Sequence, residues 1–202
     1  TRCSRDWSSD VCSSDLGVAI NEVTRDMRRN AKMVNFGIVY GISAFGLSER
    51  LNIPRGEARD IIDQYFRQYH GLKKYMDNSI AFARKNGFVE TIMGRRRYLR
   101  DINSANANIR GFAERNAINA PIQGSSADMI KIAMIRIFDE FNHRNLKSKM
   151  ILQVHDELVF DTARGEIEVV KEIVESKMKT AIRMEVPVEV DINIGENWLE
   201  AH

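Results

Sequence analysis

Four side chains between residues 28 and 40 combine two positive charges with two aromatic rings at intervals of four residues. They are Arg28, Lys32, Phe36 and Tyr40. Each step of four turns about 40° past a full revolution of an α-helix, so a helix carries all four on one side. Such a side could hold an anionic group at one end and a planar ring at the other, as a nucleoside triphosphate requires. The alternative is ordinary amphipathy, with two surface cations and two core aromatics.

A second ladder with the same interval contains only side chains that can donate hydrogen bonds, namely Arg115, Asn119 and Gln123. The minor groove of a duplex presents acceptors at every base pair, whatever the sequence. A row of donors could therefore check base-pair geometry without reading base identity. The alternative is a polar helix face whose donors are satisfied by neighbouring loops.

Asp156 and Glu157 separate two short β-prone runs at 150–155 and 158–160, and His155 directly precedes Asp156. This pattern predicts a hairpin with the acidic residues at its tip. A carboxylate on such a turn is held firmly and exposed, as a magnesium ligand must be. An aspartate selected only for its turn conformation is the alternative. Because one aspartate and its neighbour cannot build a two-metal site, a second carboxylate must come from elsewhere.

Positive charge is concentrated before the hairpin. Residues 1–155 carry 25 basic and 16 acidic side chains, whereas residues 156–202 carry 5 basic and 12 acidic ones. The basic part includes a cluster formed by Arg95, Arg96, Arg97 and Arg100. Such a distribution suits a polyanion held over one face, and an unevenly charged solvated surface is the alternative. The sequence contains no Walker-type loop, no His-Glu-x-x-His motif and no dinucleotide fingerprint.

Helical and β periodicities follow one another along the chain. We expect Pro121 and Gly124 to separate two helices, because proline and glycine interrupt helical structure. The pattern predicts an α+β fold, with helices first and then a small antiparallel sheet backed by helices. The predicted elements are helices over 24–41, 54–69 and 72–85, a small hairpin within 87–101, helices over 107–120 and 125–141, a hairpin over 150–160, a helix over 167–181 and a strand over 186–194.

The composition excludes several classes of protein. Of the 202 residues 44% are hydrophobic, but no apolar run approaches the roughly 18 residues that a membrane-spanning helix needs. The only cysteines are Cys3 and Cys12, which excludes a disulfide framework or a thiolate zinc site in the main body. Residues 1–16 lack the apolar region of a signal peptide, so we expect a cytoplasmic protein. This segment repeats Ser-Ser-Asp without periodicity, and we interpret it as non-native, adapter-derived sequence.

Taken together, the motifs resemble the bacterial DNA polymerase I type, the family A DNA polymerases. Residues 28–41, RRNAKMVNFGIVYG, look like motif B, the fingers helix. Residues 153–159, QVHDELV, look like motif C, the palm hairpin. GRRRY at 94–98 and APIQGSSAD at 120–128 also match family segments in the expected order. The resemblance covers the chain from about Gly17 to its last residue.

The resemblance implies a role for each matching position. Four residues would bind the incoming deoxynucleoside triphosphate: Arg28, Lys32, Phe36 and Tyr40. Five would contact the primer-template DNA near its growing end: Arg115, Asn119, Gln123, Gln153 and His155. Asp156 and Glu157 would hold Mg²⁺ in a two-metal site, and Asp156 and Lys32 would be the catalytic residues. The enzyme would add nucleotides to a primer 3′ end in replication and repair.

The resemblance also implies an incomplete right-hand polymerase fold, with fingers over 17–87 and the C-terminal part of the palm over 88–202. Motif A, which supplies the other metal-binding aspartate of the family, has no match here, so we expect the 202-residue chain alone to be inactive. The full-length protein is expected to be monomeric and without a membrane partner. Two alternatives remain: a non-catalytic module that binds duplex DNA, and a relative of the single-subunit RNA polymerases.

Overall fold

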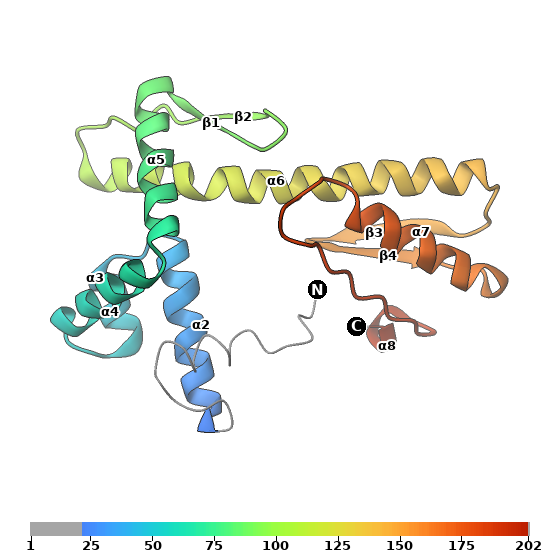
Figure 1. Ribbon diagram of the computed structural model, residues 1–202, viewed down its shortest axis with the longest axis horizontal. Coiled ribbons are helices and arrows are strands. Elements are labelled where there is room, and N and C mark those ends of the chain that lie inside the picture. Colours follow the sequence, from blue (N-terminus) through green and yellow to red (C-terminus); the bar gives the residue numbers. More distant parts are fainter. Residues whose placement is uncertain (1–21, 202) are drawn as a thin grey trace. The chain divides into compact units, whose positions relative to one another are not determined.

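The computed structural model describes residues 22–201, which fall into two compact units. The N-terminal unit extends to Ile122 and the C-terminal unit begins at Gln123. The interpretation of residues 1–16 lies outside the described residues. Figure 1 shows the elements, which are α2 (Arg25–Val39), α3 (Ala44–Leu51), α4 (Arg55–Gln68), α5 (His70–Asn86), β1 (Phe88–Glu90), β2 (Arg96–Tyr98), α6 (Ala107–His143), β3 (Lys149–Val154), β4 (Glu157–Asp161), a 3₁₀ turn η2 (Arg164–Glu166), α7 (Ile167–Lys179) and α8 (Trp198–Ala201).

The helix predicted over 24–41 is confirmed as α2, and its two ends have local causes. At the start, the Thr24 hydroxyl oxygen accepts a hydrogen bond from the Met27 N–H at 3.2 Å, as an N-cap does. At the end, Gly41 has a φ of 77°, a left-handed conformation that glycine adopts without steric cost. The helix therefore stops one turn after Phe36 and Gly37.

Helix α3 was not predicted from the sequence. The Ser43 hydroxyl caps it by accepting from the Gly46 N–H at 3.1 Å, and Asn52, with a φ of 54°, ends it. Its eight residues give only two helical turns, too few for a clear apolar period. The helices predicted over 54–69 and 72–85 are confirmed as α4 and α5.

The core of the N-terminal unit forms where α5, the β1–β2 hairpin and the first half of α6 meet (Figure 1). The hairpin confirms the one predicted within 87–101, and Phe88 pairs with Tyr98 across it. The Tyr75 hydroxyl on α5 donates to the Ile118 carbonyl on α6 at 2.8 Å, and burial raises the pKa of Tyr75. The buried cluster consists of Ala83, Val89, Leu99, Ile102, Ala113, Ala117 and Ala120.

Helix α6 corrects the prediction of two helices separated near Pro121. It is one helix of 37 residues with Pro121 inside it. An interior proline costs about 3 kcal/mol because it removes a backbone hydrogen bond and crowds the preceding turn. Burial on both sides offsets this cost, since Ala117 before the proline and Ile137 after it are fully buried. Within residues 22–201, no helix is both long and apolar enough to cross a membrane.

In the C-terminal unit, the β3–β4 hairpin packs with the second half of α6 and with α7 (Figure 1). The strands are antiparallel, which confirms the predicted hairpin. Their last pair is Val154 with Glu157, so the two turn residues are His155 and Asp156, and the prediction that Asp156 and Glu157 separate the strands is wrong by one residue. The reason is that His155, with a φ of 53°, leaves the extended conformation one residue earlier. The Phe141 and Phe160 rings lie 5.9 Å apart and join α6 to β4. The buried cluster consists of Ala133, Ile137, Phe141, Val170, Ile173, Val174 and Ala181. Helices and two small antiparallel sheets together confirm the α+β prediction.

The strand predicted over 186–194 is wrong. Each of the two sheets in the described part of the chain has two strands, and this segment joins neither of them. The apolar side of this alternation is only partly buried, because Ile192 packs against the core while Val186 and Ile194 on the same side are 70% and 56% exposed. Apolar alternation alone does not make a strand, because ladder hydrogen bonds also need a partner strand.

Glu166 ties the start of β3 to the segment that follows β4. Its carboxylate accepts hydrogen bonds from the Lys147 N–H at 3.0 Å and from the N–H and hydroxyl of Ser148 at 2.9 and 2.6 Å. The Ser148 hydroxyl oxygen in turn accepts from the Ala163 N–H at 3.1 Å. These donors, the Lys147 N–H first, lower the pKa of Glu166. The base of the hairpin is therefore fixed at the end opposite Asp156.

Candidate functional site

A cavity of about 630 Å³ in the N-terminal unit collects residues from three helices. Lys32 and Phe36 come from α2, Tyr40 is the C-cap of α2, Arg50 comes from α3 and Arg115 from α6. The remaining lining residues are Met33, Gly37, Gly41, Ile42 and Ser43. Among the described residues, the lining thus carries three cations and no carboxylate, which is the composition that a polyanionic ligand requires.

Phe36 and Tyr40 present their rings to this cavity as a stacked pair. The ring centroids lie 6.3 Å apart with an interplanar angle of 15°, and the residues are 48% and 49% exposed. They are not core aromatics, so the interpretation of α2 as an ordinary amphipathic helix is wrong for this pair. Exposed ring faces can stack against a nucleobase. Arg28, one turn before Lys32, is half-buried and is not among the cavity residues.

Gly41 allows Arg115 to approach the end of α2. A Cβ atom placed on Gly41 would lie 3.1 Å from the Arg115 Cγ, a tighter contact than most side chains tolerate. Gly41 also has a φ of 77°, which glycine adopts without steric cost. This position therefore favours glycine both for its backbone conformation and for the space it leaves to Arg115. The Arg115 guanidinium lies 6.0 Å from the centre of the Phe112 ring on its own helix.

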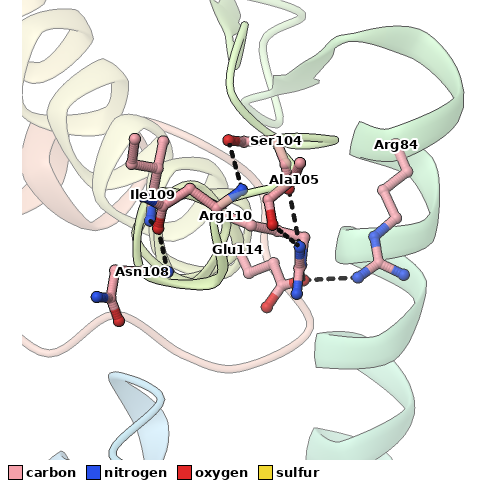
Figure 2. Close-up of polar contacts among 8 residues, drawn as sticks. Arg84, Ser104, Ala105, Asn108, Ile109, Arg110 and Glu114 are labelled. Atoms are coloured by element: carbon pink, nitrogen blue, oxygen red, sulfur yellow. Dashed lines mark hydrogen bonds and ion pairs between the residues drawn. The ribbon is translucent and has the colours of Figure 1, made fainter.

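Polar contacts at the start of α6 fix the helix that carries Arg115 (Figure 2). The Asn106 side-chain oxygen accepts from the Asn108 N–H at 2.9 Å and so caps the helix. Figure 2 shows Glu114 reaching Arg84 on α5, with an N···O distance of 2.6 Å. Arg110 donates to the Ser104 carbonyl at 2.8 Å. The first turns of α6 are thereby joined both to the preceding loop and to α5.

The donor ladder lies on one uninterrupted helix. Because α6 continues through Pro121, Arg115, Asn119 and Gln123 keep the spacing of four that places them on one side. Asn119 is half-buried, whereas Arg115 and Gln123 are exposed. Arg115 and Asn119 belong to the N-terminal unit, and Gln123 is the first residue of the C-terminal unit.

Asp156 lies at the exposed tip of the β3–β4 hairpin, in the two-residue turn that it forms with His155. His155 has a φ of 53°, and Asp156 is not among the positive-φ residues. Positive φ at the first turn residue alone is typical of type II′ turns, which favour glycine there. The Gln153 amide donates to the His155 carbonyl at 3.0 Å and stabilises this conformation. An uncommon backbone conformation is thus held beside the candidate metal ligand.

Glu157 also has a fixed orientation, because its Oε1 accepts a hydrogen bond from the Trp198 indole N–H at 3.0 Å. Within residues 22–201 there is no group of three or more His, Cys, Asp or Glu side chains that could hold a metal ion. Magnesium is commonly bound by one or two carboxylates together with waters and substrate phosphates. Asp156 and Glu157 therefore fit part of a magnesium site and leave its other ligands to be supplied.

Two residues that the structure brings to the cavity and to the hairpin tip are not predicted from the sequence. Arg50 lines the cavity, and it was missed because α3, which carries it, was not predicted. The signal available was Ser43 as a cap three residues before Gly46. Trp198 contacts Glu157 over a separation of 41 residues, and no periodicity in the sequence connects them.

Comparison with known proteins identifies what this chain is similar to. The sequence model described as DNA polymerase family A matches residues 3–200. DNA polymerase I of Caldicellulosiruptor bescii is 50% identical over 195 residues, which cover 96% of this chain and 23% of that protein. DNA polymerase I of Bacillus subtilis is 50% identical over 184 residues, which cover 91% of this chain and 21% of that protein.

One solved structure matches nearly the whole chain. It is described as the POL domain of Pol1 from M. smegmatis in complex with DNA primer-template and dNTP. The TM-score is 0.93 at 42% identity, and the match covers 98% of this chain and 35% of that one. The chain therefore has the fold of part of a polymerase domain and spans about a fifth to a quarter of the length of the two DNA polymerase I relatives.

Proposed function

The chain belongs to DNA polymerase family A, and from this premise we propose that the complete protein carries out DNA-directed DNA synthesis. Its substrates would be deoxynucleoside triphosphates and a primer-template, and it would act in replication and repair. The observation that carries the proposal is the cavity at α2, where cations and exposed rings meet and the described lining residues include no carboxylate. The relatives are named DNA polymerase I, which disfavours the alternative of an RNA polymerase relative.

In this proposal α2 binds the incoming nucleotide. Lys32 and Arg28 neutralise the triphosphate, and Lys32 helps to stabilise the charge that develops during transfer. Phe36 packs against the sugar and base, and Tyr40 lies near the templating base. The stacking of the Phe36 and Tyr40 rings at 6.3 Å supports these roles, because each ring holds the other in place before a nucleotide binds.

The donor ladder binds the primer-template near its growing end. Arg115, Asn119 and Gln123 would donate to minor-groove acceptors, which are present at every base pair. His155 would contact the same duplex from the hairpin tip. Gln153 would support it, since the amide of Gln153 already holds the His155 carbonyl at 3.0 Å. This arrangement checks pairing geometry rather than base identity.

The chemical step is attack of the primer 3′ hydroxyl oxygen on the α-phosphate of the nucleotide. A new O–P bond forms, the bond between the α- and β-phosphates breaks, pyrophosphate leaves, and the hydroxyl proton passes to solvent. Asp156 would hold Mg²⁺, with Glu157 beside it. When bound, magnesium supplies charge stabilisation at the attacking and leaving oxygens. The chain's own residues then position the reactants, and correct orientation accounts for much of the acceleration of such a reaction.

Several expectations from the sequence stay predictions. These are the boundary between fingers and palm at 87/88, the inactivity of the 202-residue chain alone, the monomeric state and the cytoplasmic location. For the activity of the chain alone, the reasoning is that a two-metal site needs a carboxylate in addition to those at the hairpin tip.

The experiment that tests the proposal is Asp156→Asn in the full-length polymerase. Asp161→Asn is the matched control, because Asp161 is an exposed aspartate at the far end of the same hairpin. We expect Asp156→Asn to lower primer extension by roughly a thousandfold while duplex affinity stays within about twofold. Full synthesis by Asp156→Asn would remove the metal assignment. Duplex binding without synthesis by the unmodified protein would favour the non-catalytic module.

A further inference from the structure

The last described residues form a small, tightly built unit rather than a loose end. Gly195 lies directly against the backbone of α8, since a Cβ atom there would be 2.7 Å from the Ala201 nitrogen and 2.9 Å from the Glu200 carbonyl carbon. Backbone atoms cannot yield to such a contact as a flexible side chain can. The close packing of residues 195–197 on α8 therefore requires glycine at this position.

Reciprocal hydrogen bonds close the same turn. The Asn197 side-chain oxygen accepts from the Glu200 N–H at 3.1 Å, and the Asn197 amide donates to Glu200 Oε1 at 2.7 Å. The second oxygen of Glu200 accepts from the Glu196 N–H at 3.1 Å. The pair resembles a capping box in its spacing of three, but Glu200 accepts from the Asn197 side-chain amide and the Glu196 N–H rather than from the Asn197 N–H. The turn and α8 are thus fixed relative to each other.

The residue that this unit holds in place is Trp198, the first residue of α8. Its indole N–H donates to Glu157 Oε1 at 3.0 Å, a good geometry for a charge-assisted hydrogen bond. Glu157 directly follows Asp156 and begins β4. A carboxylate has two oxygens with about four acceptor positions, so one indole bond orients it without exhausting its binding capacity.

We infer that Trp198 is a positioning residue of the polymerase site, and that residues 195–201 serve to orient the Glu157 carboxylate beside Asp156. The inference rests on the proposed function. A carboxylate next to a metal ligand is effective only in one orientation, and groups that orient such ligands strongly affect activity. Gln153 restrains the turn through the His155 carbonyl, and Trp198 restrains the Glu157 carboxylate that follows the turn.

The first measurement concerns the contact itself and does not depend on synthesis. Full-length polymerase labelled with 5-fluorotryptophan gives a ¹⁹F resonance for Trp198, which is assigned by its loss in Trp198→Phe. We expect this resonance to shift in Glu157→Ala, because the carboxylate that accepts the indole bond is removed. It should stay in place in Leu199→Ala, since Leu199 is the neighbouring residue of α8 and is 87% exposed.

The second measurement is kinetic and uses the same full-length proteins. Trp198→Phe keeps an aromatic ring at this position but removes the indole N–H. We therefore expect kcat to fall about fivefold, the effect of one net hydrogen bond. KM for the nucleotide and affinity for DNA should stay unchanged. The double variant with Glu157→Ala should be no slower than Glu157→Ala alone, because both changes remove the same contact. Leu199→Ala should match the unmodified protein.

Three results would overturn the inference: an unshifted Trp198 resonance in Glu157→Ala, losses in kcat that multiply in the double variant, or an equal loss in Leu199→Ala. A polymerase without synthesis would instead overturn the proposed function. The ¹⁹F result would then still report on the contact, so the two failures are distinguishable.

Discussion

Replacing Gly41 by alanine should damage the polymerase in a way that the same change at Gly87 does not. Both glycines have a φ of 77°, a left-handed backbone conformation that is unfavourable for alanine. Alanine at either position should therefore lower the free energy of unfolding by about 1–2 kcal/mol. Only Gly41 also meets a neighbour, the Arg115 Cγ at 3.1 Å, whereas nothing lies within 4 Å of Gly87. The pair therefore separates loss of stability from displacement of Arg115.

The functional loss expected for Gly41→Ala follows from this contact. The Arg115 side chain must move by a few tenths of an ångström, which would weaken the hydrogen bonds that we propose it makes to the duplex. A good contact of this kind is worth about 1–3 kcal/mol, and partial loss places the effect near the lower end. One kcal/mol is about fivefold in an equilibrium constant. Gly41→Ala should thus bind primer-template about fivefold more weakly, whereas Gly87→Ala should bind it normally.

The assay is fluorescence anisotropy with a labelled primer-template, together with urea unfolding of the full-length variants. Both variants should lose similar stability, and only Gly41→Ala should lose affinity. Equal loss of affinity in both variants would refute the reasoning, because the effect would then come from destabilisation. Unchanged affinity in Gly41→Ala would remove Arg115 from the duplex contacts.

The other predictions concern α2, the hairpin tip and the hairpin base. Lys32→Ala should raise KM for the nucleotide more than tenfold with little change in DNA affinity. A loss of DNA affinity with an unchanged KM, in the same kinetic and anisotropy assays, would show that Lys32 binds the duplex instead of the nucleotide. Gln153→Met should lower kcat several-fold in single-nucleotide incorporation, because the hydrogen bond to the His155 carbonyl is lost. A rate equal to that of the unmodified protein would show that the turn keeps its conformation without Gln153. For Glu166, a pKa lowered on folding means that its stabilising effect is complete above the ordinary value of 4.5 and is lost as the pH falls through the lowered pKa. Glu166→Gln should therefore show a weaker loss of stability between pH 5 and 3 in urea unfolding, and an unchanged pH dependence would contradict this.

The parts of the fold that could be predicted are those with a strong local cause. Thr24 caps α2 and Gly41 ends it, so local chemistry alone sets both of its boundaries. The β3–β4 hairpin was predictable because apolar alternation surrounds a short acidic turn at Asp156. In the same way, the spacing of four from Lys32 to Tyr40 is sufficient to place the cavity residues of α2 on one side of the helix.

The errors arose where tertiary contacts outweigh local preference. Pro121 favours a break, but burial before and after it keeps α6 continuous. Residues 186–194 alternate like a strand, but this segment joins neither of the described sheets, and Ile192 on its apolar side packs against the core without a pairing partner. Arg50 was missed at the cavity because α3 is too short to show an apolar period, and Trp198 was missed at the hairpin because its contact with Glu157 spans 41 residues of sequence.

The central claim is that α2 and the hairpin tip serve one reaction, with a nucleotide held by Lys32 at its triphosphate and by Asp156 at the reacting phosphate. A crystal structure of the full-length protein with primer-template, Mg²⁺ and a non-hydrolysable nucleotide tests this most directly. We predict the Lys32 Nζ within about 3.2 Å of a triphosphate oxygen and Asp156 bound to the metal at the α-phosphate. A nucleotide bound away from Lys32 and Phe36, or a metal bound without Asp156, would contradict the account.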